Sequence, residues 1–253
     1  MKTISVIAYN RPAYLRRVLE ALAKCRGVND YHVVVSIDNG LMYPETIKVA
    51  REFRHETLMP ANHYGVDLHP FKVYELVFFN GSDFNVVLED DTVPSPDALE
   101  LADWFCEHGK EYAYLSLHNG STKPEDPTAL EENMRFCPWG WACTREMWQK
   151  WFAPNWNCKV NEPRGWDWSM GVIIQRNGLK CLNPRMSRTL NIGREGGVYE
   201  TPDHFDSFHG PTVAHDGSPV EYRIASRLPA GYQQDVESWV KEAVCPRKRS
   251  SPC

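Results

Sequence analysis

Short apolar runs and helix-like segments alternate through the first 120 residues of the chain. Runs rich in β-branched residues at 3–9, 32–37 and 86–88 predict buried strands. Helical spacing is clearest at 13–25, where four aliphatic residues share one face: Leu15, Val18, Leu19 and Leu22. This alternation predicts an α/β fold, with a mostly parallel central sheet and helices on both of its faces.

The same patterns predict further elements and then weaken. Helices are expected at 45–53, 71–79, 96–108 and 169–176, and strands at 56–59 and 113–117. By contrast, the stretches 122–164 and 183–219 are rich in Pro, Asn, Gly and Trp and have little periodicity. Because long irregular stretches in a compact domain are usually functional, we expect binding loops in this second half.

Three carboxylates follow one of the predicted strands directly, in the run VVLEDD at 86–91. Neighbouring carboxylates repel one another, and each loses hydration beside an apolar strand, so a positive charge is needed among them. A divalent cation such as Mn2+ or Mg2+, held by few protein ligands and a diphosphate, would supply that charge. The open alternative is an acidic, solvated turn, which the following residues TVPSPD also suit.

Composition and missing motifs exclude several classes of function. A net charge of -5 with a pI near 6.0 argues against binding to nucleic acid. No apolar run approaches the roughly 20 residues that a membrane-spanning helix needs. Neither GxGxxG nor GxxxxGK[ST] occurs, so the phosphate-binding loops of dinucleotide enzymes and P-loop NTPases are absent. A nucleotide must therefore be held in another way.

The expected compartment is the cytoplasm, because strand-like sequence begins at residue 3 and leaves no room for a signal peptide. The Golgi lumen is the alternative for a chain trimmed of an anchor. The eight cysteines show no CxxC pair, and most are expected to be reduced. A bridge from Cys158 to Cys137 or to Cys181 stays open.

Seven segments resemble, in order, the N-acetylglucosaminyltransferase I family and its O-mannose-linked relatives. They are VIAYNRPAYLRRVLEAL, VVVSIDNG, HPFKVYELVFF, NVVLEDDTVPSPD, CPWGWACTREMW, RGWDWSM and CLNPRMSRTLNIGREG. The resemblance implies a GT-A glycosyltransferase fold, with a Rossmann-like, mostly parallel central sheet and irregular acceptor-side loops. It also implies an inverting transfer from UDP-GlcNAc with Mn2+. UDP-xylose or another UDP-hexose stays open as the donor.

The resemblance implies which five residues contact the nucleotide and the metal ion. It implies that Arg11 and Asp38 hold the uracil ring, that His69 contacts the nucleotide, and that Asp91 binds the metal ion. Asp90 would contact the ribose or the water shell of the metal. Locally, each has a plainer reading: Asp38 suits a turn before Asn-Gly, Arg11 a surface charge at a helix start, and His69 a loop residue.

The donor sugar and the acceptor are assigned by the same resemblance. Glu89 would bind hydroxyls of the donor sugar, while Trp139 and Trp166 would line the donor pocket. Asp167 falls where the family carries its catalytic base, which takes the proton of the attacking hydroxyl. The local alternative for Asp167 is the N-cap of the helix at 169–176.

Three arginines lie in or near a glycine-rich loop that the resemblance places at the diphosphate of the donor. Arg194, like Arg185 and Arg188, would face the diphosphate, with surface arginines as the alternative. The family places a serine in this loop, whereas this chain reads GGVY at 196–199. A further metal ligand from the histidines and the acid nearby is a minor alternative: His204, Asp206, His209 and His215.

The expected organisation is a single GT-A catalytic domain at 1–245, followed by a basic flexible tail at 246–253. Residues 1–120 would form the nucleotide-binding half and 121–245 the acceptor-binding half. The expected partners are a UDP-sugar donor and a glycan acceptor, with the chain acting as a monomer. Two other functions stay open: a sugar- or nucleotide-binding module with weak catalysis, and a nucleotidyltransferase that uses the same acidic cluster.

Overall fold

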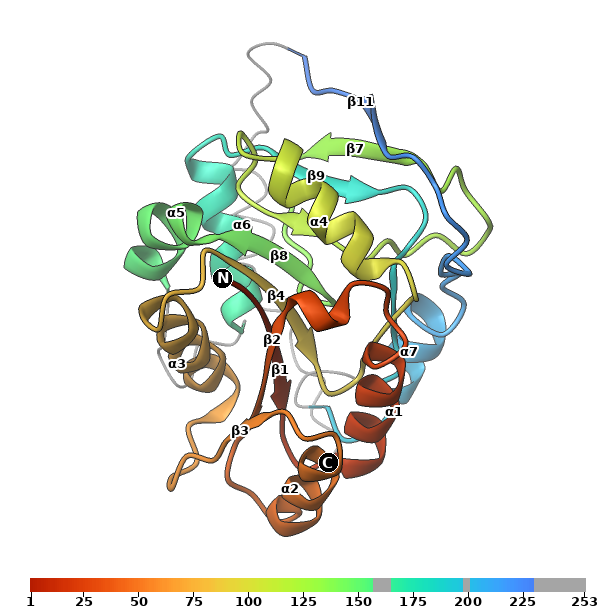
Figure 1. The fold of residues 1–253 in the computed structure, drawn as a ribbon. Coiled ribbons are helices and arrows are strands. Elements are labelled where there is room, and N and C mark those ends of the chain that lie inside the picture. Colours follow the sequence, from red (N-terminus) through yellow and green to blue (C-terminus); the bar gives the residue numbers. More distant parts are fainter. Residues whose placement is uncertain (157–164, 198–200, 230–253) are drawn as a thin grey trace, which may run out of the picture.

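The computed structural model describes residues 1–156, 165–197 and 201–229 of the chain. A nine-stranded sheet runs through the centre of the molecule, with helices packed against it (Figure 1). A second sheet has two strands. In the described part of the chain, no helix has the length and apolar character needed to cross a bilayer. The tail at 246–253 and Cys158 lie outside the described residues.

The first half of the chain forms the parallel part of the sheet. Its strands are β1 (Lys2–Ala8), β2 (His32–Ile37), β3 (Glu56–Leu58) and β4 (Phe84–Glu89), in the spatial order β4-β1-β2-β3. The connecting helices are α1 (Pro12–Leu22), α2 (Tyr43–Glu52) and α3 (Gly65–Phe79), with a short 3-10 turn η1 (Val28–Asp30). The predicted strand and helix alternation is confirmed for this half.

The start of α3 differs from the sequence prediction. The helix begins at Gly65 rather than at residue 71. A proline inside a helix removes one backbone hydrogen bond, so the prediction placed the helix after Pro70. The structure accommodates Pro70 within the helix, in the buried part of its surface. This earlier start brings residues 65–70 to the end of the sheet where the site lies.

The second half of the chain extends the same sheet instead of forming only loops. The added strands are β6 (Leu115–Ser116), β7 (Ala129–Asn133), β8 (Trp141–Thr144), β9 (Cys181–Pro184) and β11 (Arg223–Ser226). β8 runs antiparallel to both β4 and β6. The helical elements that follow β4 in the chain are α4 (Ala98–His108), α5 (Arg145–Met147), η2 (Trp148–Phe152), η3 (Ala153–Asn155), α6 (Trp166–Arg176) and α7 (Pro202–Phe208).

A buried acidic residue explains why one of these strands is hard to recognise in the sequence. Glu132 in β7 points into the core, where an apolar residue is the usual choice. Its carboxylate accepts hydrogen bonds from Tyr112 at 2.7 Å, from Lys180 at 3.0 Å and from the backbone of Leu228 at 2.9 Å. These partners compensate the lost hydration, so the strand is stable without an apolar alternation.

Two apolar clusters cover the two faces of the sheet. One contains the inward residues of α1, α2 and α4, including the four aliphatic residues predicted for α1. The other contains α3, α6 and most of the tryptophans. In the second cluster, Tyr74 of α3 makes edge-on contacts with Trp141, Trp148 and Trp166 at ring distances of 5.5, 5.6 and 6.4 Å. This aromatic cluster fixes the start of α6.

The two-stranded sheet joins distant parts of the chain beside the acidic run. β5 (Thr92–Pro94) pairs antiparallel with β10 (Thr189–Asn191), so Asn191 lies opposite Thr92. The backbone N–H of Ile192 donates to the carbonyl of Asp91 at 2.8 Å. The residues that follow β10 are thereby held over the end of β4.

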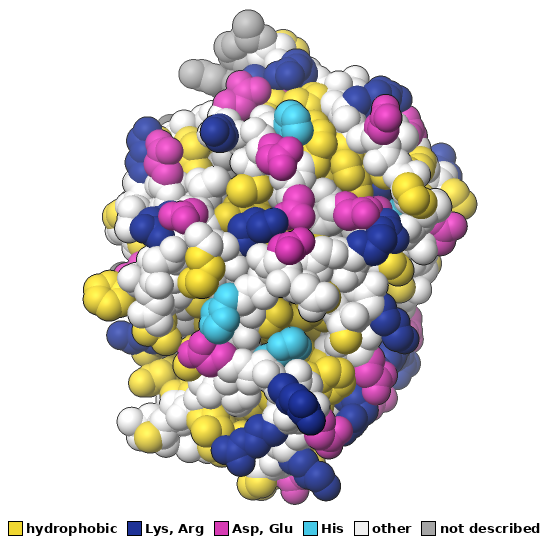
Figure 2. Space-filling model, viewed as in Figure 1, with side chains coloured by type: hydrophobic (Ala, Val, Ile, Leu, Met, Phe, Trp, Pro, Cys, Tyr) yellow, Lys and Arg dark blue, Asp and Glu magenta, His cyan; other side chains and the backbone are white. Residues whose placement is uncertain are grey.

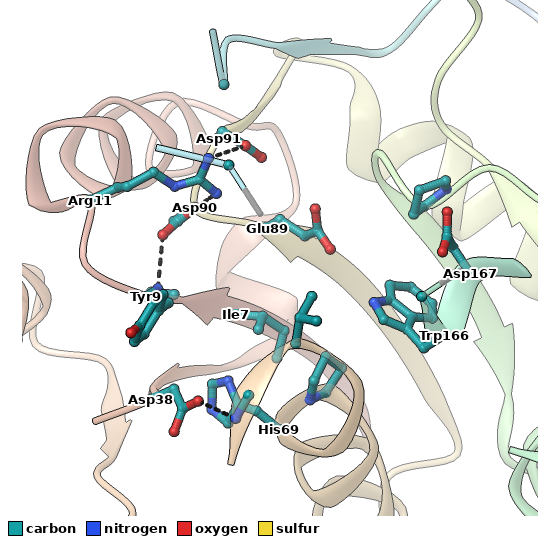
Figure 3. A pocket seen from close by; sticks show the side chains of 18 of the residues that line it. Ile7, Tyr9, Arg11, Asp38, His69, Glu89, Asp90, Asp91, Trp166 and Asp167 are labelled. Atoms are coloured by element: carbon teal, nitrogen blue, oxygen red, sulfur yellow. Dashed lines mark hydrogen bonds and ion pairs between the residues drawn. The ribbon is translucent and has the colours of Figure 1, made fainter. Parts of the chain in front are cut away.

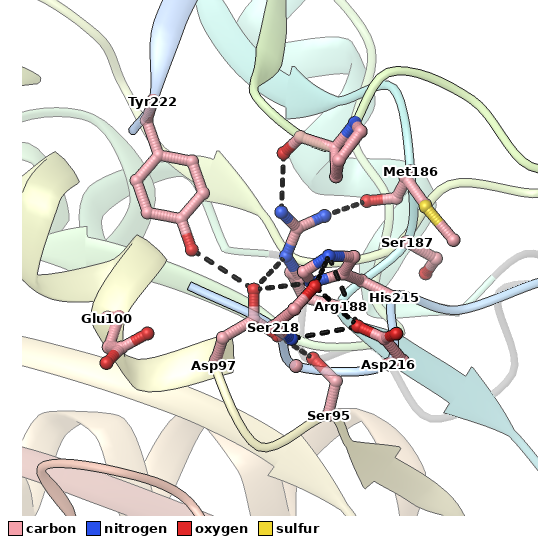
Figure 4. Close-up of polar contacts among 12 residues, drawn as sticks. Ser95, Asp97, Glu100, Met186, Ser187, Arg188, His215, Asp216, Ser218 and Tyr222 are labelled. Atoms are coloured by element: carbon pink, nitrogen blue, oxygen red, sulfur yellow. Dashed lines mark hydrogen bonds and ion pairs between the residues drawn. The ribbon is translucent and has the colours of Figure 1, made fainter. Parts of the chain in front are cut away.

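A buried polar cluster around Asp97 holds β10 in place (Figure 4). Asp97 stands at the N-cap position of α4, but its side chain makes no capping bond there. Its carboxylate accepts instead from Arg188 at 2.6 Å, from His215 at 2.9 Å and from Ser95 at 2.7 Å. Although burial alone would raise it, these partners hold the pKa of Asp97 below its ordinary value.

Charges of both signs are mixed on the face of the molecule seen in Figure 1. Lys and Arg side chains alternate there with Asp and Glu side chains (Figure 2). The described residues include surface ion pairs, such as Arg16 with Glu52 at 2.8 Å and Arg185 with Glu131 at 2.6 Å. Exposed pairs of this kind contribute little to stability.

Replacing Arg188 by Met should lower the free energy of unfolding by about 3–5 kcal/mol, because Asp97 would keep its burial and lose its cation. Urea unfolding at neutral pH measures this change. The stabilisation should be complete above the unfolded-state pKa of about 3.9 and should fall as the pH drops through the lower folded-state value. Arg185→Met, which removes an exposed pair, is the matched control, and its free energy of unfolding should stay close to that of the parent chain. Equal losses in the two variants would contradict the assigned role of Arg188.

Candidate active site

A cavity of about 680 Å³ opens where β1, β2 and β4 end and α6 begins. This is the edge at which open α/β sheets place their ligands. Nine of the ten residues proposed from the sequence line this cavity. They are Arg11, Asp38, His69, Glu89, Asp90, Asp91, Trp139, Trp166 and Asp167. Figure 3 shows the carboxylates and Arg11 around the opening.

Glu89, Asp90 and Asp91, here called the acidic row, lie where β4 ends and the chain turns into β5. Asp90 is buried, and its carboxylate accepts from the backbone N–H of Tyr9 at 2.9 Å and from the guanidinium of Arg11. Asp91 is also buried, and its Oδ2 lies 2.7 Å from Nη1 of Arg11. One arginine therefore bridges two neighbouring carboxylates.

Burial and mutual repulsion change the acidity of the row. Burial, followed by the negative charge of Asp91, raises the pKa of Glu89 well above its ordinary value. For Asp90, burial raises the pKa to about 7, although Arg11 opposes the change. The charges of Asp90 and Asp91 in turn hold the pKa of Arg11 above its ordinary value, although burial alone would lower it. The row therefore favours an added positive charge.

Asp91 has the properties of a ligand for a divalent cation. Its Oδ1 is buried and has no hydrogen-bond partner among the described residues. Nowhere in the described part of the chain do three or more metal-binding side chains gather in one group. A cation at Asp91 would therefore take most of its ligands from a diphosphate and water, as Mg2+ and related ions often do. The residues present fit such an ion.

Gly193 approaches Asp91 from the residues that follow β10. A Cβ atom at Gly193 would lie 2.1 Å from Oδ2 of Asp91, which is far inside contact distance. The backbone N–H of Gly193 donates to Oδ1 of Asn191 at 2.8 Å, which fixes this turn. Only glycine allows the chain to pass so close to the carboxylate.

Asp38 organises a loop at the rim of the cavity. Its carboxylate accepts the backbone N–H of Tyr64 at 2.9 Å and of Gly65 at 2.8 Å, and Nδ1 of His63 lies at 2.9 Å. These partners lie in the loop at 63–65, not in the turn at Asn-Gly that the sequence alternative for Asp38 named. Arg11 and Asp38 share the cavity, but the structure gives them different partners: Arg11 contacts the acidic row and Asp38 contacts the loop.

His69 lies deeper, on the buried face of α3. Its Nε2 is 2.8 Å from Oγ of Ser36 at the end of β2. Burial lowers the pKa of His69 to about 4, although Asp38 acts in the opposite direction. The ring is therefore neutral at pH 7. A neutral imidazole here can accept or donate one hydrogen bond toward a nucleotide.

Asp167 enters the cavity from the opposite side, in the first turn of α6. The N-cap residue of α6 is Gly165. Asp167 lies inside the helix and is therefore not its N-cap, which was the alternative role expected from the sequence. Burial raises the pKa of Asp167, and backbone N–H bonds of the helix start act in the opposite direction. Trp166 stacks on Trp156 at a ring distance of 5.0 Å and fixes this turn. Figure 3 shows Glu89 pointing toward Asp167 across the cavity.

The two tryptophans of the segment PWGW divide between cavity and core. Trp139 lines the cavity and meets His209 edge-on at a ring distance of 4.1 Å. Trp141 is buried in β8 within the aromatic cluster. Gly140 between them has a φ of +89°, a conformation that favours glycine and turns the two rings apart.

The structure does not bring Arg194 to the cavity. Its guanidinium pairs with Asp206 on the surface, with Nε 2.9 Å from Oδ1. Arg185 and Arg188 also pair elsewhere, with Glu131 and Asp97. These arginines lie near the loop in sequence, but acidic residues outside the cavity hold them. Tyr199 lies outside the described residues.

Several cavity residues were not singled out from the sequence. Tyr9 contributes its backbone N–H to Asp90, while His63 and Gly65 line the rim through Asp38. Any residue except proline can make such contacts through its backbone N–H, so the sequence does not reveal them. Gly193 lies in the stretch 183–219, which the sequence predicted to be irregular, and nothing in the sequence showed that Asp91 is its neighbour. His204 lines the cavity, as the minor metal-ligand alternative allowed.

Solved structures with a similar fold are nucleotide-sugar enzymes and a nucleotidyltransferase. S. aureus TarS 1-349 in complex with UDP-GlcNAc has a TM-score of 0.56 at 15% identity, over 81% of this chain and 64% of that chain. The mannosyltransferase PcManGT from Pyrobaculum calidifontis, in complex with GDP-Man and Mn2+, has a TM-score of 0.54 at 16% identity, over 72% and 54%. A cytidylyltransferase from Leptospira borgpetersenii has a TM-score of 0.51 at 14% identity, over 77% and 82%.

These likenesses concern the fold. This chain spans 54% to 64% of the two transferases named above. No protein-family model matches the sequence. The expected fold class is confirmed: a mixed α/β fold with a large, mostly parallel central sheet, of the GT-A glycosyltransferase kind.

Replacing Gly193 by Ala should lower the free energy of unfolding by about 1–3 kcal/mol, because the added methyl group overlaps Oδ2 of Asp91. Chemical denaturation measures the loss. Gly120→Ala is the matched control, since a Cβ there meets nothing within 4 Å and the expected change is within about 0.5 kcal/mol. If both variants unfold at the same denaturant concentration as the parent chain, the close approach of Gly193 to Asp91 is wrong.

Proposed function

We propose that the chain is a glycosyltransferase that takes its sugar from a nucleotide diphosphate sugar. One observation carries this proposal: two separate carboxylate sites, the row at the end of β4 and Asp167 at the start of α6, face the same cavity. An inverting transfer needs these two functions on opposite sides of one sugar. The cavity volume, about 680 Å³, is in the range of sites that enclose small ligands.

In this proposal Asp167 acts as the base. Its carboxylate accepts the proton of the acceptor hydroxyl while that oxygen forms a bond to the anomeric carbon and the bond to the nucleotide diphosphate breaks. Burial supports this role, because the raised pKa makes the carboxylate a stronger base. Trp166 and Trp139 line the cavity on the same side and offer apolar faces to a sugar ring.

The acidic row would hold the departing nucleotide diphosphate. Asp91, whose buried Oδ1 has no hydrogen-bond partner among the described residues, would bind a divalent cation, Mn2+ or Mg2+. When bound, such an ion neutralises the charge that develops on the leaving phosphate. Asp90 would position Arg11 and the ribose side of the donor, and Glu89, which points into the cavity, would accept hydrogen bonds from the sugar.

The donor is proposed to be a UDP-sugar. UDP-GlcNAc is favoured by the resemblance to the N-acetylglucosaminyltransferase I family, and the fold neighbour TarS is recorded with UDP-GlcNAc. UDP-xylose or another UDP-hexose stays open, and the acceptor is proposed to be a glycan hydroxyl. Asp38 and His69 lie where they would contact the base, with Asp38 acting through the loop that it holds. Residues 1–245 would form one catalytic domain.

A second candidate is a nucleotidyltransferase, which forms a nucleotide sugar with release of pyrophosphate. It is favoured by the cytidylyltransferase neighbour, of which this chain covers 82%. The same acidic row would hold a metal and a triphosphate. That reaction has no need of a base on the far side of the cavity, so Asp167 separates the two candidates.

Incubation with Mn2+ and a panel of nucleotide sugars, with measurement of the released nucleotide, tests the proposal. Slow release of UDP from one UDP-sugar, stimulated by glycan acceptors, is the expected result. Consumption or release of pyrophosphate would favour the nucleotidyltransferase. Binding of nucleotide without turnover would favour a binding module.

Asp167→Asn should reduce turnover in this assay by about 100- to 10,000-fold, because the amide cannot take the proton. Its affinity for the donor should stay close to that of the parent chain, since the acidic row is intact. Calorimetric titration with UDP and Mn2+ checks the affinity. If donor binding falls as steeply as turnover, Asp167 has a structural role and the assignment of the base is wrong.

A further inference from the structure

The guanidinium of Arg11 already provides a positive charge at the acidic row. It contacts both Asp90 and Asp91, and Nη1 lies 2.7 Å from Oδ2 of Asp91. The side chains of the three residues are 19%, 2% and 9% exposed, so water screens these charges only weakly. A cation that bridges two buried carboxylates removes much of their repulsion. Arg11 thus occupies the place of a counter-ion.

In this arrangement neither oxygen of Asp91 is open to a hydrated cation. Oδ2 is covered by Arg11 on one side and by the backbone of Gly193 on the other, where a Cβ would lie at 2.1 Å. Oδ1 is buried, and no donor among the described residues reaches it. A metal ion that binds Asp91 must therefore displace the guanidinium from the row.

The cavity gives the displaced side chain a place to go. Arg11 lines the same cavity that would hold the diphosphate. Its aliphatic stem passes beneath Gly196, whose φ is +75° and where a Cβ would lie 3.4 Å from Cδ of Arg11. A guanidinium pairs with phosphate oxygens as well as with carboxylates, through the same two-pronged geometry. A bound diphosphate is thus a second acceptor within reach of the same side chain.

We propose that Arg11 is the resident cation of the acidic row and that it couples metal binding to nucleotide binding. The nucleotide diphosphate draws the guanidinium away from Asp91, and the divalent cation takes the vacated position. This inference rests on the proposed function, which places a diphosphate and a metal ion in this cavity. The coupling is reciprocal, so each ligand strengthens the binding of the other by the same factor.

Calorimetric titration of Mn2+ into the protein, with and without UDP, tests the coupling. The parent chain should bind Mn2+ weakly alone and more tightly with UDP. In Arg11→Met, Mn2+ alone should bind about tenfold more tightly or better, because two buried carboxylates lose their cation. The gain on adding UDP should shrink in the same variant. Arg16→Met, on the same helix and paired with Glu52 at the surface, should behave like the parent chain.

Thermal unfolding gives an independent measurement that needs no turnover. In EDTA, Arg11→Met should melt at a lower temperature than the parent chain, and Mn2+ should raise its melting temperature by more. Arg11→Lys provides a second variant if Arg11→Met folds poorly. A single ammonium group cannot bridge both carboxylates, so its Mn2+ affinity should be intermediate.

The possible failures can be told apart. Equal Mn2+ affinity of the parent chain and Arg11→Met in the absence of UDP, with undiminished coupling to UDP, would overturn the role of Arg11 and leave the proposed function standing. If neither the parent chain nor any variant binds Mn2+ even with UDP, the metal assignment of the proposed function fails, and this inference fails with it.

Discussion

Two buried, adjacent carboxylates at the end of β4 set the conditions for the rest of the site. Asp90 and Asp91 repel each other and have lost most of their hydration, so they need a cation between them. Arg11, carried to this point by the turn between β1 and α1, supplies it. The close approach of Gly193 and the backbone bond from Tyr9 shape the remaining space around the row. In the proposed function, the diphosphate and the metal ion would shift this charge balance.

Two rigid structures outside the cavity hold its walls. On one side, the buried cluster of Asp97 and Arg188 anchors β10 against β5 and so places Gly193 over the row. On the other side, the aromatic cluster around Tyr74 supports Trp166 and thereby the first turn of α6 with Asp167. Asp97 and Arg188 are not among the residues that line the cavity, whereas Trp166 is. The two carboxylate sites are therefore positioned by separate parts of the fold, which suits the separate tasks proposed for them.

The sequence predicts the first half of this molecule well, because strong apolar periodicity in α1 and β-branched runs in β1 and β2 reflect local burial. It fails where long-range contacts decide the structure. β7 was not predicted, because Glu132 interrupts its apolar pattern and the partners that stabilise Glu132 lie on distant segments. The start of α3 was missed because Pro70 lies inside the helix. In the site, the family resemblance, rather than local residue patterns, pointed to the nine cavity residues. It also assigned Arg194, which Asp206 holds elsewhere. The partners of Arg11 and Asp38 also required the fold.

In the proposed function, the acidic row and Asp167 act on opposite sides of one sugar. The stereochemistry of the reaction tests this arrangement. Proton NMR of the newly formed product, recorded before its anomers equilibrate, shows the configuration of the transferred or hydrolysed sugar at the anomeric carbon. A single displacement predicts a configuration opposite to that of the donor. Retention of the donor configuration would contradict the claim, because it requires attack from the side on which the nucleotide diphosphate leaves.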